Sequence, residues 1–86
     1  PIHAAAANGS LNILRHLLTQ GADPNARQQN GLTPLHTAAY SNNAQMAQLL
    51  LEFGADASLT DDSGQTPAAL AQTLGNEIVL KELIPG

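Results

Sequence analysis

Apolar residues along this chain fall in short groups whose members are three and four positions apart, which is the spacing of one face of an α-helix. In the middle of the chain the groups are Leu35, Ala38 and Ala39, followed by Met46, Leu49, Leu50 and Phe53. The polar pair Asn42-Asn43 interrupts the pattern between them. This arrangement predicts two short amphipathic helices joined by a turn.

The residues at the ends of these segments are typical of helix boundaries. Thr33 can cap a helix by accepting a hydrogen bond from a backbone N–H, and Pro34 suits the first helical position, where no N–H is needed. Gly54 follows the second helix and tolerates the left-handed conformation with which many helices end. The polar run Asp61-Asp62-Ser63-Gly64 then predicts a turn before the next Thr-Pro pair.

The whole pattern repeats along the chain. Pro1, Pro34 and Pro67 are separated by 33 positions each. The second helix of the first period carries Ile13, Leu14, Leu17 and Leu18, and that of the third carries Ile78, Val79, Leu80, Leu83 and Ile84 before Pro85-Gly86 ends it. One helix pair cannot bury its apolar face alone, so neighbouring pairs stack on a shared core, with Leu50 at the buried seam. We predict one all-α array over residues 1–86, with units of about 1–30, 31–63 and 64–86, the first and last incomplete.

The chain resembles the ankyrin repeat in its period and in two segments, 31–39 (GLTPLHTAA) and 49–56 (LLLEFGAD). The resemblance implies an ankyrin-repeat solenoid, in which stacked antiparallel helix pairs are joined by β-hairpin-like loops. It also implies a protein-binding module without catalysis, whose partner contacts the concave face formed by the hairpin tips and the first helices.

The outer units depart from the middle one. Gln72 and Glu82 make the last unit more polar, as a terminal unit that faces water requires. The first unit has no hairpin of its own, and its segment 4–7 and Leu11 are expected to be partly uncovered. We therefore expect further repeats before Pro1, and a monomer unless this N-terminal face associates with itself.

Composition and charge exclude several classes of function. The formal net charge is −4, and the three basic residues are scattered, which disfavours nucleic-acid binding. No apolar run is long enough to span a bilayer. The chain has no cysteine, which excludes disulfides and thiolate metal sites. We expect no metal and no cofactor, no nucleic-acid or membrane partner, and a cytoplasmic or nuclear location.

The residues that could bind a metal or act in catalysis are each better explained by a structural role. His3 and His36 are 33 residues apart, and each is expected to form hydrogen bonds near a helix start and to tie one repeat to the next. Thr33 and His36 have capping rather than catalytic spacing, and no other residues complete a catalytic site. The run 61–64 lacks the alternating ligands of a calcium loop. It is expected to be a solvated acidic tip that favours a partner with a basic patch.

The family pattern places partner-binding residues on the tips and the first helices. Tyr40 is the first candidate hot spot, because it replaces small residues of the other units and tyrosine is enriched in hot spots. Leu32 is the second, with packing against its own hairpin as an equally weighted alternative. The remaining candidates are Arg27, Gln29, Asn30, Ser41, Asp62, Ser63, Gln65, Thr73 and Leu74.

Two further hypotheses depend on the resemblance. Leu17, Asp23 and Asn25 match the spacing at which ankyrin hairpin asparagines can be hydroxylated, which makes Asn25 a candidate modification site. The alternative to a binding module is a structural spacer in a longer solenoid whose activity lies elsewhere in the protein.

Overall fold

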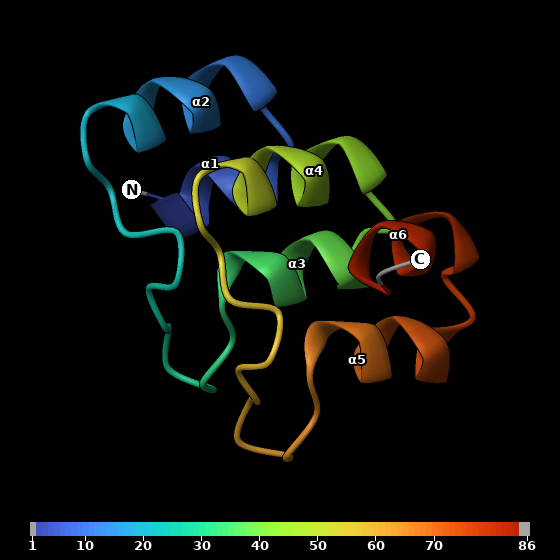
Figure 1. Cartoon of the computed structure of the whole chain (residues 1–86). Helices are drawn as coiled ribbons and strands as arrows, with labels where there is room; N and C mark the ends of the chain where they lie inside the picture. The colour runs from blue at the N-terminus through green and yellow to red at the C-terminus, as the bar shows by residue number, and fades with distance from the viewer. Residues whose placement is uncertain (1, 85–86) are drawn as a thin grey trace.

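The computed structural model describes residues 2–84, and within this range it contains six α-helices and no strand (Figure 1). The helices are α1 (Ile2–Asn8), α2 (Leu11–Thr19), α3 (Pro34–Tyr40), α4 (Ala44–Glu52), α5 (Pro67–Leu74) and α6 (Glu77–Leu83). They form three pairs, each joined by a short turn, as the sequence predicts. The predicted helix end at Pro85-Gly86 lies outside the described residues.

Local capping explains where the helices begin. The side chain of Thr33 accepts a hydrogen bond from the backbone N–H of His36, and Thr66 does the same for Ala69 at the start of α5. Pro34 and Pro67 occupy the first helical position. At the end of α4, Gly54 has a φ of 91°, which confirms its predicted left-handed conformation.

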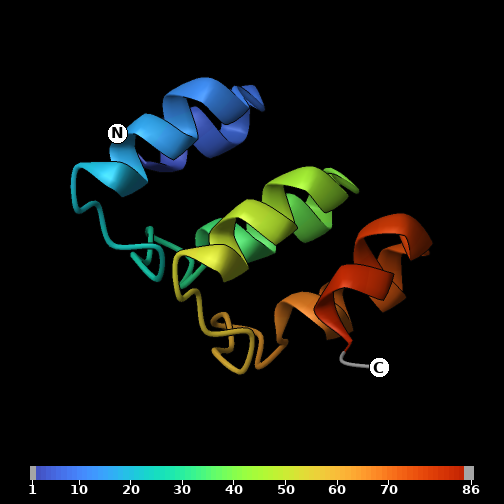
Figure 2. The same cartoon turned by 45° about the horizontal axis from the view of Figure 1, so that its top comes forward.

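The three pairs stack in a line (Figure 2). The first helices pack as one layer, α1 against α3 and α3 against α5, while the second helices pack as another, α2 against α4 and α4 against α6. Leu50 has no exposed surface, which confirms its predicted place in the core. The other fully covered apolar side chains of the described residues are Leu14, Ala38, Ala39, Met46, Ala47, Ala71 and Val79. The prediction of an all-α stack of helix pairs is confirmed.

Two loops project to the same side of the stack (Figures 1 and 2). We name their ends tip 1 (residues 27–32) and tip 2 (residues 60–65). In tip 1 the N–H of Gln28 donates to the carbonyl of Leu32 at 3.0 Å, and in tip 2 the N–H of Asp61 donates to the carbonyl of Gln65 at 2.9 Å. These bonds give both loops the predicted hairpin-like form without a strand.

His36 ties the second unit to the third, as predicted. Its Nδ1 accepts from the backbone N–H of Thr33 at 3.1 Å, so the ring proton lies on Nε2, which donates to the carbonyl of Gln65 at 2.8 Å. The same prediction is wrong for His3, whose two ring nitrogens are buried without a hydrogen-bond partner among the described residues. Leu32 is the equivalent of Gln65, and its carbonyl forms no hydrogen bond with the His3 ring.

Both outer units expose apolar side chains, and the last unit exposes Leu74, Ile78 and Ile84. At one end Gln72 is exposed on α5, as expected of a polar last unit. At the other, Ile13 is 55% exposed although its equivalents Met46 and Val79 have no exposed surface. The side chain of Ile13 faces outward because no unit covers it in residues 2–84.

Candidate binding surface

Two hollows of about 350 Å³ each lie between the first helices and the hairpin tips. The outer hollow is bordered by tip 2, and its lining consists of Asn30, Leu32, Tyr40, Asp61, Asp62, Ser63, Gln65 and Leu70. The inner hollow extends toward the first unit, and its lining consists of His3, Ala7, Gln28, Leu32, His36, Thr37, Tyr40, Ser41 and Leu70. Three side chains line both hollows: Leu32, Tyr40 and Leu70.

Tyr40 stands out from this surface because its neighbours along the stack are small. It is the last residue of α3, and the equivalent positions of α1 and α5 are Ala7 and Thr73. The side chain is 69% exposed, more than any other large hydrophobic residue described. The ring is therefore available to a partner on the side of the array that the sequence analysis selects.

Two leucines form the apolar part of the surface. Leu32, at the end of tip 1, is half-buried and lines both hollows, so it packs against the hairpin and still offers a contact. Leu70, half-buried on α5, is a lining residue that was not among the predicted contacts. Leu70 lies one period after Thr37 and three residues before Thr73, the equivalent of Tyr40 in α5. Residues three apart lie on the same face of a helix, so this spacing could have identified Leu70.

The two acidic residues of tip 2 have different roles. Oδ1 of Asp61 accepts hydrogen bonds from the backbone N–H groups of Ser63 and Gln65, both at 2.9 Å, so this carboxylate holds the turn together. Asp62 is exposed, and its backbone N–H donates to the carbonyl of Asn30 at 3.1 Å. Tip 2 therefore rests on tip 1, and Asp62 presents its charge at the edge of the outer hollow.

The remaining predicted contact residues divide into two groups. Gln65 Nε2 donates to Thr73 Oγ1 at 3.0 Å, which links tip 2 to α5 beside the outer hollow. Arg27, Gln29 and Leu74 are exposed but line neither hollow. Of the predicted contact residues, the two hollows are thus lined by Asn30, Leu32, Tyr40, Ser41, Asp62, Ser63 and Gln65, and not by Arg27, Gln29, Thr73 or Leu74.

Asn25 lies outside this surface, in the loop that follows α2. Its Oδ1 accepts from the backbone N–H of Asp56 at 2.6 Å, a link from the first loop to the second. Asp56 in turn accepts from the hydroxyl and backbone N–H of Ser58, and these hydrogen bonds lower the pKa of its carboxyl. Hydroxylation of Asn25 stays a prediction, on a side chain that already has a structural role.

His3 lines the inner hollow, where its ring is partly buried. Burial lowers the pKa of His3 below its ordinary value. The neutral imidazole is therefore favoured at pH 7. Its uncharged ring adds no positive charge to the surface around Tyr40.

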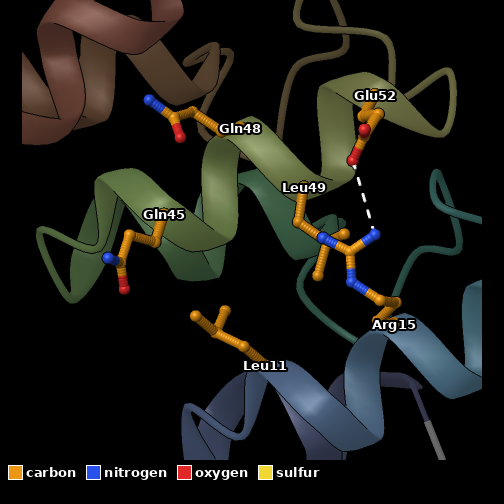
Figure 3. Close-up of a pocket in the computed structure, with 6 residues that line it drawn as sticks. All are labelled: Leu11, Arg15, Gln45, Gln48, Leu49 and Glu52. Atoms are coloured by element: carbon orange, nitrogen blue, oxygen red, sulfur yellow. Dashed lines mark ion pairs between the residues drawn. The ribbon is translucent and has the colours of Figure 1, made fainter.

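A larger groove lies on the opposite side, between α2 and α4 (Figure 3). It has a volume of about 510 Å³ and is lined by Leu11, Arg15, Gln45, Gln48, Leu49 and Glu52. Arg15 reaches from α2 toward Glu52 of α4 at 3.7 Å, and both side chains are mostly exposed, so the ion pair contributes little stability. The groove contains none of the predicted contact residues.

Two classes of site find no support among the described residues. Within residues 2–84, no group of three or more histidine, aspartate or glutamate side chains is placed to hold a metal ion. In the same range, every helix is too short or too polar to cross a bilayer.

Comparison with known families gives a match over nearly the whole chain. A family model described as ankyrin repeats matches residues 2–86 in three copies. No curated protein is similar enough to the chain to count as a match. The family match covers all the helices described above and both hairpin tips.

Proposed function

Because the chain belongs to the ankyrin repeat family, whose members generally mediate contacts between proteins, we propose that it is a non-catalytic module that binds a partner protein. The partner contacts the concave side, formed by the first helices and the two tips. Catalysis plays no part in this proposal, in keeping with the generally non-catalytic character of the family.

The exposed ring of Tyr40 is the observation that carries the proposal. It stands between two half-buried leucines, Leu32 and Leu70, where the two hollows meet. An amphipathic ring beside apolar side chains in a concave surface is the arrangement that forms binding hot spots between proteins. The partner covers this ring and the leucines with apolar surface and meets the polar tips at its rim.

Charge narrows the choice of partner. The chain has a formal net charge of −4, and Asp62 presents a carboxylate at the edge of the surface. A partner with a basic patch is favoured because opposite potentials speed the encounter and fix its orientation. We propose that the array acts as a monomer unless its N-terminal face associates with itself.

A structural spacer in a longer array is the second candidate function, and one observation favours it. Ile13 is 55% exposed at a position that is covered in the other two units. Exposed apolar surface of this kind fits stacking against another repeat.

Replacement of Tyr40 tests the proposal. Proteins captured by the immobilised array are identified, and the affinity of each purified partner is measured for the parent, Tyr40→Ala and Ile78→Ala. Ile78 is the matched control, since it is 63% exposed on α6, away from the tips. We expect Tyr40→Ala to weaken binding by more than about 1 kcal/mol and Ile78→Ala to leave it unchanged.

The spacer function makes a different prediction. It requires that Tyr40→Ala has no effect on any partner, and that the isolated chain self-associates until additional repeats are fused before Pro1. Sedimentation of the chain with and without the added repeats measures this directly.

A further inference from the structure

The outer hollow combines three kinds of surface that one side chain can satisfy together. Leu32 and Leu70 supply apolar wall, Tyr40 supplies an aromatic ring, and Asp62 supplies a carboxylate at the edge. A long cationic side chain places its methylene stem against apolar atoms, its charge near a ring face and its donors on a carboxylate. We infer that the outer hollow is a subsite for one arginine side chain of the partner protein.

The inference rests on the proposed function and on the absence of a competing cation in the hollow. None of the three basic residues of the chain lines it. Arg15 is paired with Glu52 on the opposite side, and Lys81 lies on α6. Arg27 is exposed in tip 1, and among the described residues it forms no ion pair with Asp62. The charge of Asp62 is thus met by no cation of the described residues, and an incoming guanidinium supplies one.

Other occupants fit the hollow less well. An acidic side chain would meet the like charges of Asp61 and Asp62. A purely apolar side chain would displace water from Asp62 without replacing its hydrogen bonds, which is unfavourable. Arginine is favoured over lysine, because its planar guanidinium can lie on the Tyr40 ring and donate two parallel bonds to a carboxylate.

The hollow is held in place before any partner arrives. The Asp61 carboxylate bonds the tip 2 backbone, and Asp62 donates from its N–H to Asn30 in tip 1. The Gln65 carbonyl accepts from His36, and its side chain donates to Thr73. Binding therefore orders few groups of this chain, which lowers the entropic cost of association.

Selection from a random peptide library displayed on phage tests the inference. The parent array, Asp62→Asn and Glu52→Gln are immobilised in parallel and the bound peptides are sequenced. Glu52→Gln is the matched control, since it removes the same charge from the opposite side of the array. We expect arginine to be enriched at one position on the parent and on Glu52→Gln, and not on Asp62→Asn.

A selected peptide is then synthesised with arginine and with citrulline, which keeps the shape and loses the charge. On the parent, citrulline is expected to weaken binding by about tenfold or more, as the loss of a charge-assisted hydrogen bond does. On Asp62→Asn the two peptides are expected to bind within about twofold of each other, since their difference depends on that carboxylate.

Each outcome bears on a distinct claim. A library without an enriched arginine, an equal citrulline effect on Asp62→Asn, or an equal loss in Glu52→Gln overturns the arginine subsite. If Tyr40→Ala still weakens partner binding by more than about 1 kcal/mol while these tests fail, the proposed function stands and only the subsite is wrong. If Tyr40→Ala has no effect either, both are wrong.

Discussion

Two histidines at the same place in the repeat show how much one residue depends on its neighbours. His36 has no exposed surface and uses both ring nitrogens, one inside its own unit and one on the carbonyl of Gln65. His3 uses neither. The same residue type therefore joins two units in one case and contributes no hydrogen bond in the other.

This difference predicts unequal costs of removal. His36→Ala leaves the buried N–H of Thr33 without its acceptor and opens a cavity, so we expect a loss of about 3 kcal/mol or more in the free energy of unfolding. His3→Ala is expected to cost less than about 1 kcal/mol, because it breaks no hydrogen bond. Urea unfolding followed by circular dichroism gives both values, and equal losses would refute the assigned bonds of His36.

Gly31 and Gly64 are a second pair of equivalent residues in different surroundings. Both have a positive φ, 75° and 81°, which favours glycine. A Cβ on Gly31 would lie 2.6 Å from Oδ1 of Asp62, whereas a Cβ on Gly64 would meet nothing within 4 Å. Gly31 thus lets tip 2 rest on tip 1.

Alanine at each glycine separates backbone strain from this contact. Gly64→Ala is expected to lose about 1–2 kcal/mol through its positive φ alone. Gly31→Ala carries the same strain and in addition pushes tip 2 away, so its loss is expected to be larger. Thermal or urea unfolding of both variants measures the difference, and a Gly31→Ala variant no less stable than Gly64→Ala would contradict the stacking of the tips.

The helices are too short to be stable alone, and neighbouring units help to complete their ends. They have seven to nine residues each, below the length at which an isolated helix persists in water. Asn76 precedes α6 but makes no cap bond to it. Instead, Oδ1 of Asn42 accepts from the N–H of Val79 in α6, and Nδ2 of Asn76 donates to the carbonyl of Ala39 in α3. The second and third units thus exchange caps.

The exchange predicts opposite results for one chemical change at two positions. Asn42→Asp keeps the acceptor oxygen and adds negative charge at the start of α6, so stability is expected to change by less than about 0.5 kcal/mol or to rise. Asn76→Asp removes the donor and sets an oxygen against the carbonyl of Ala39, so we expect a loss of about 1 kcal/mol or more. The urea midpoints of the two variants measure this difference. The reverse order would mean that the amide oxygen and nitrogen of Asn42 and Asn76 are exchanged.

At the scale of the whole molecule, the three pairs share one core. Leu50 is fully buried on α4, the helix that packs against both α2 and α6. No unit has enough apolar contact to remain folded when the middle one is disrupted. A change at this position therefore acts on all three units.

Leu50→Ala is expected to lower the free energy of unfolding by about 2–5 kcal/mol and to leave a single cooperative transition, if the array still folds. Ile78→Ala, at an exposed position of α6, is expected to cost less than about 1 kcal/mol. Chemical denaturation with fluorescence of Tyr40 and circular dichroism measures both. A parent-like midpoint for Leu50→Ala would show that this side chain does not occupy the core.

The sequence by itself determined the elements and their order, because the interactions that define them are local. The cap at Thr33, the left-handed Gly54 and the apolar spacing of α3 and α4 depend on residues within one or two helical turns, and the 33-residue period repeats them. Tyr40 could also be selected as a candidate contact residue, since its size departs from that of Ala7 and Thr73 in the other units.

Only the tertiary structure decided which side chains meet across units. Ile13 and Met46 occupy the same place in the pattern, but a neighbouring unit covers only Met46. The addition of Leu70 to the site and the separate roles of Asp61 and Asp62 likewise depend on how one unit lies on the next. Burial and hydrogen bonding between residues about 30 positions apart are set by the packing of whole units. The spacing of apolar residues within one helix does not determine that packing.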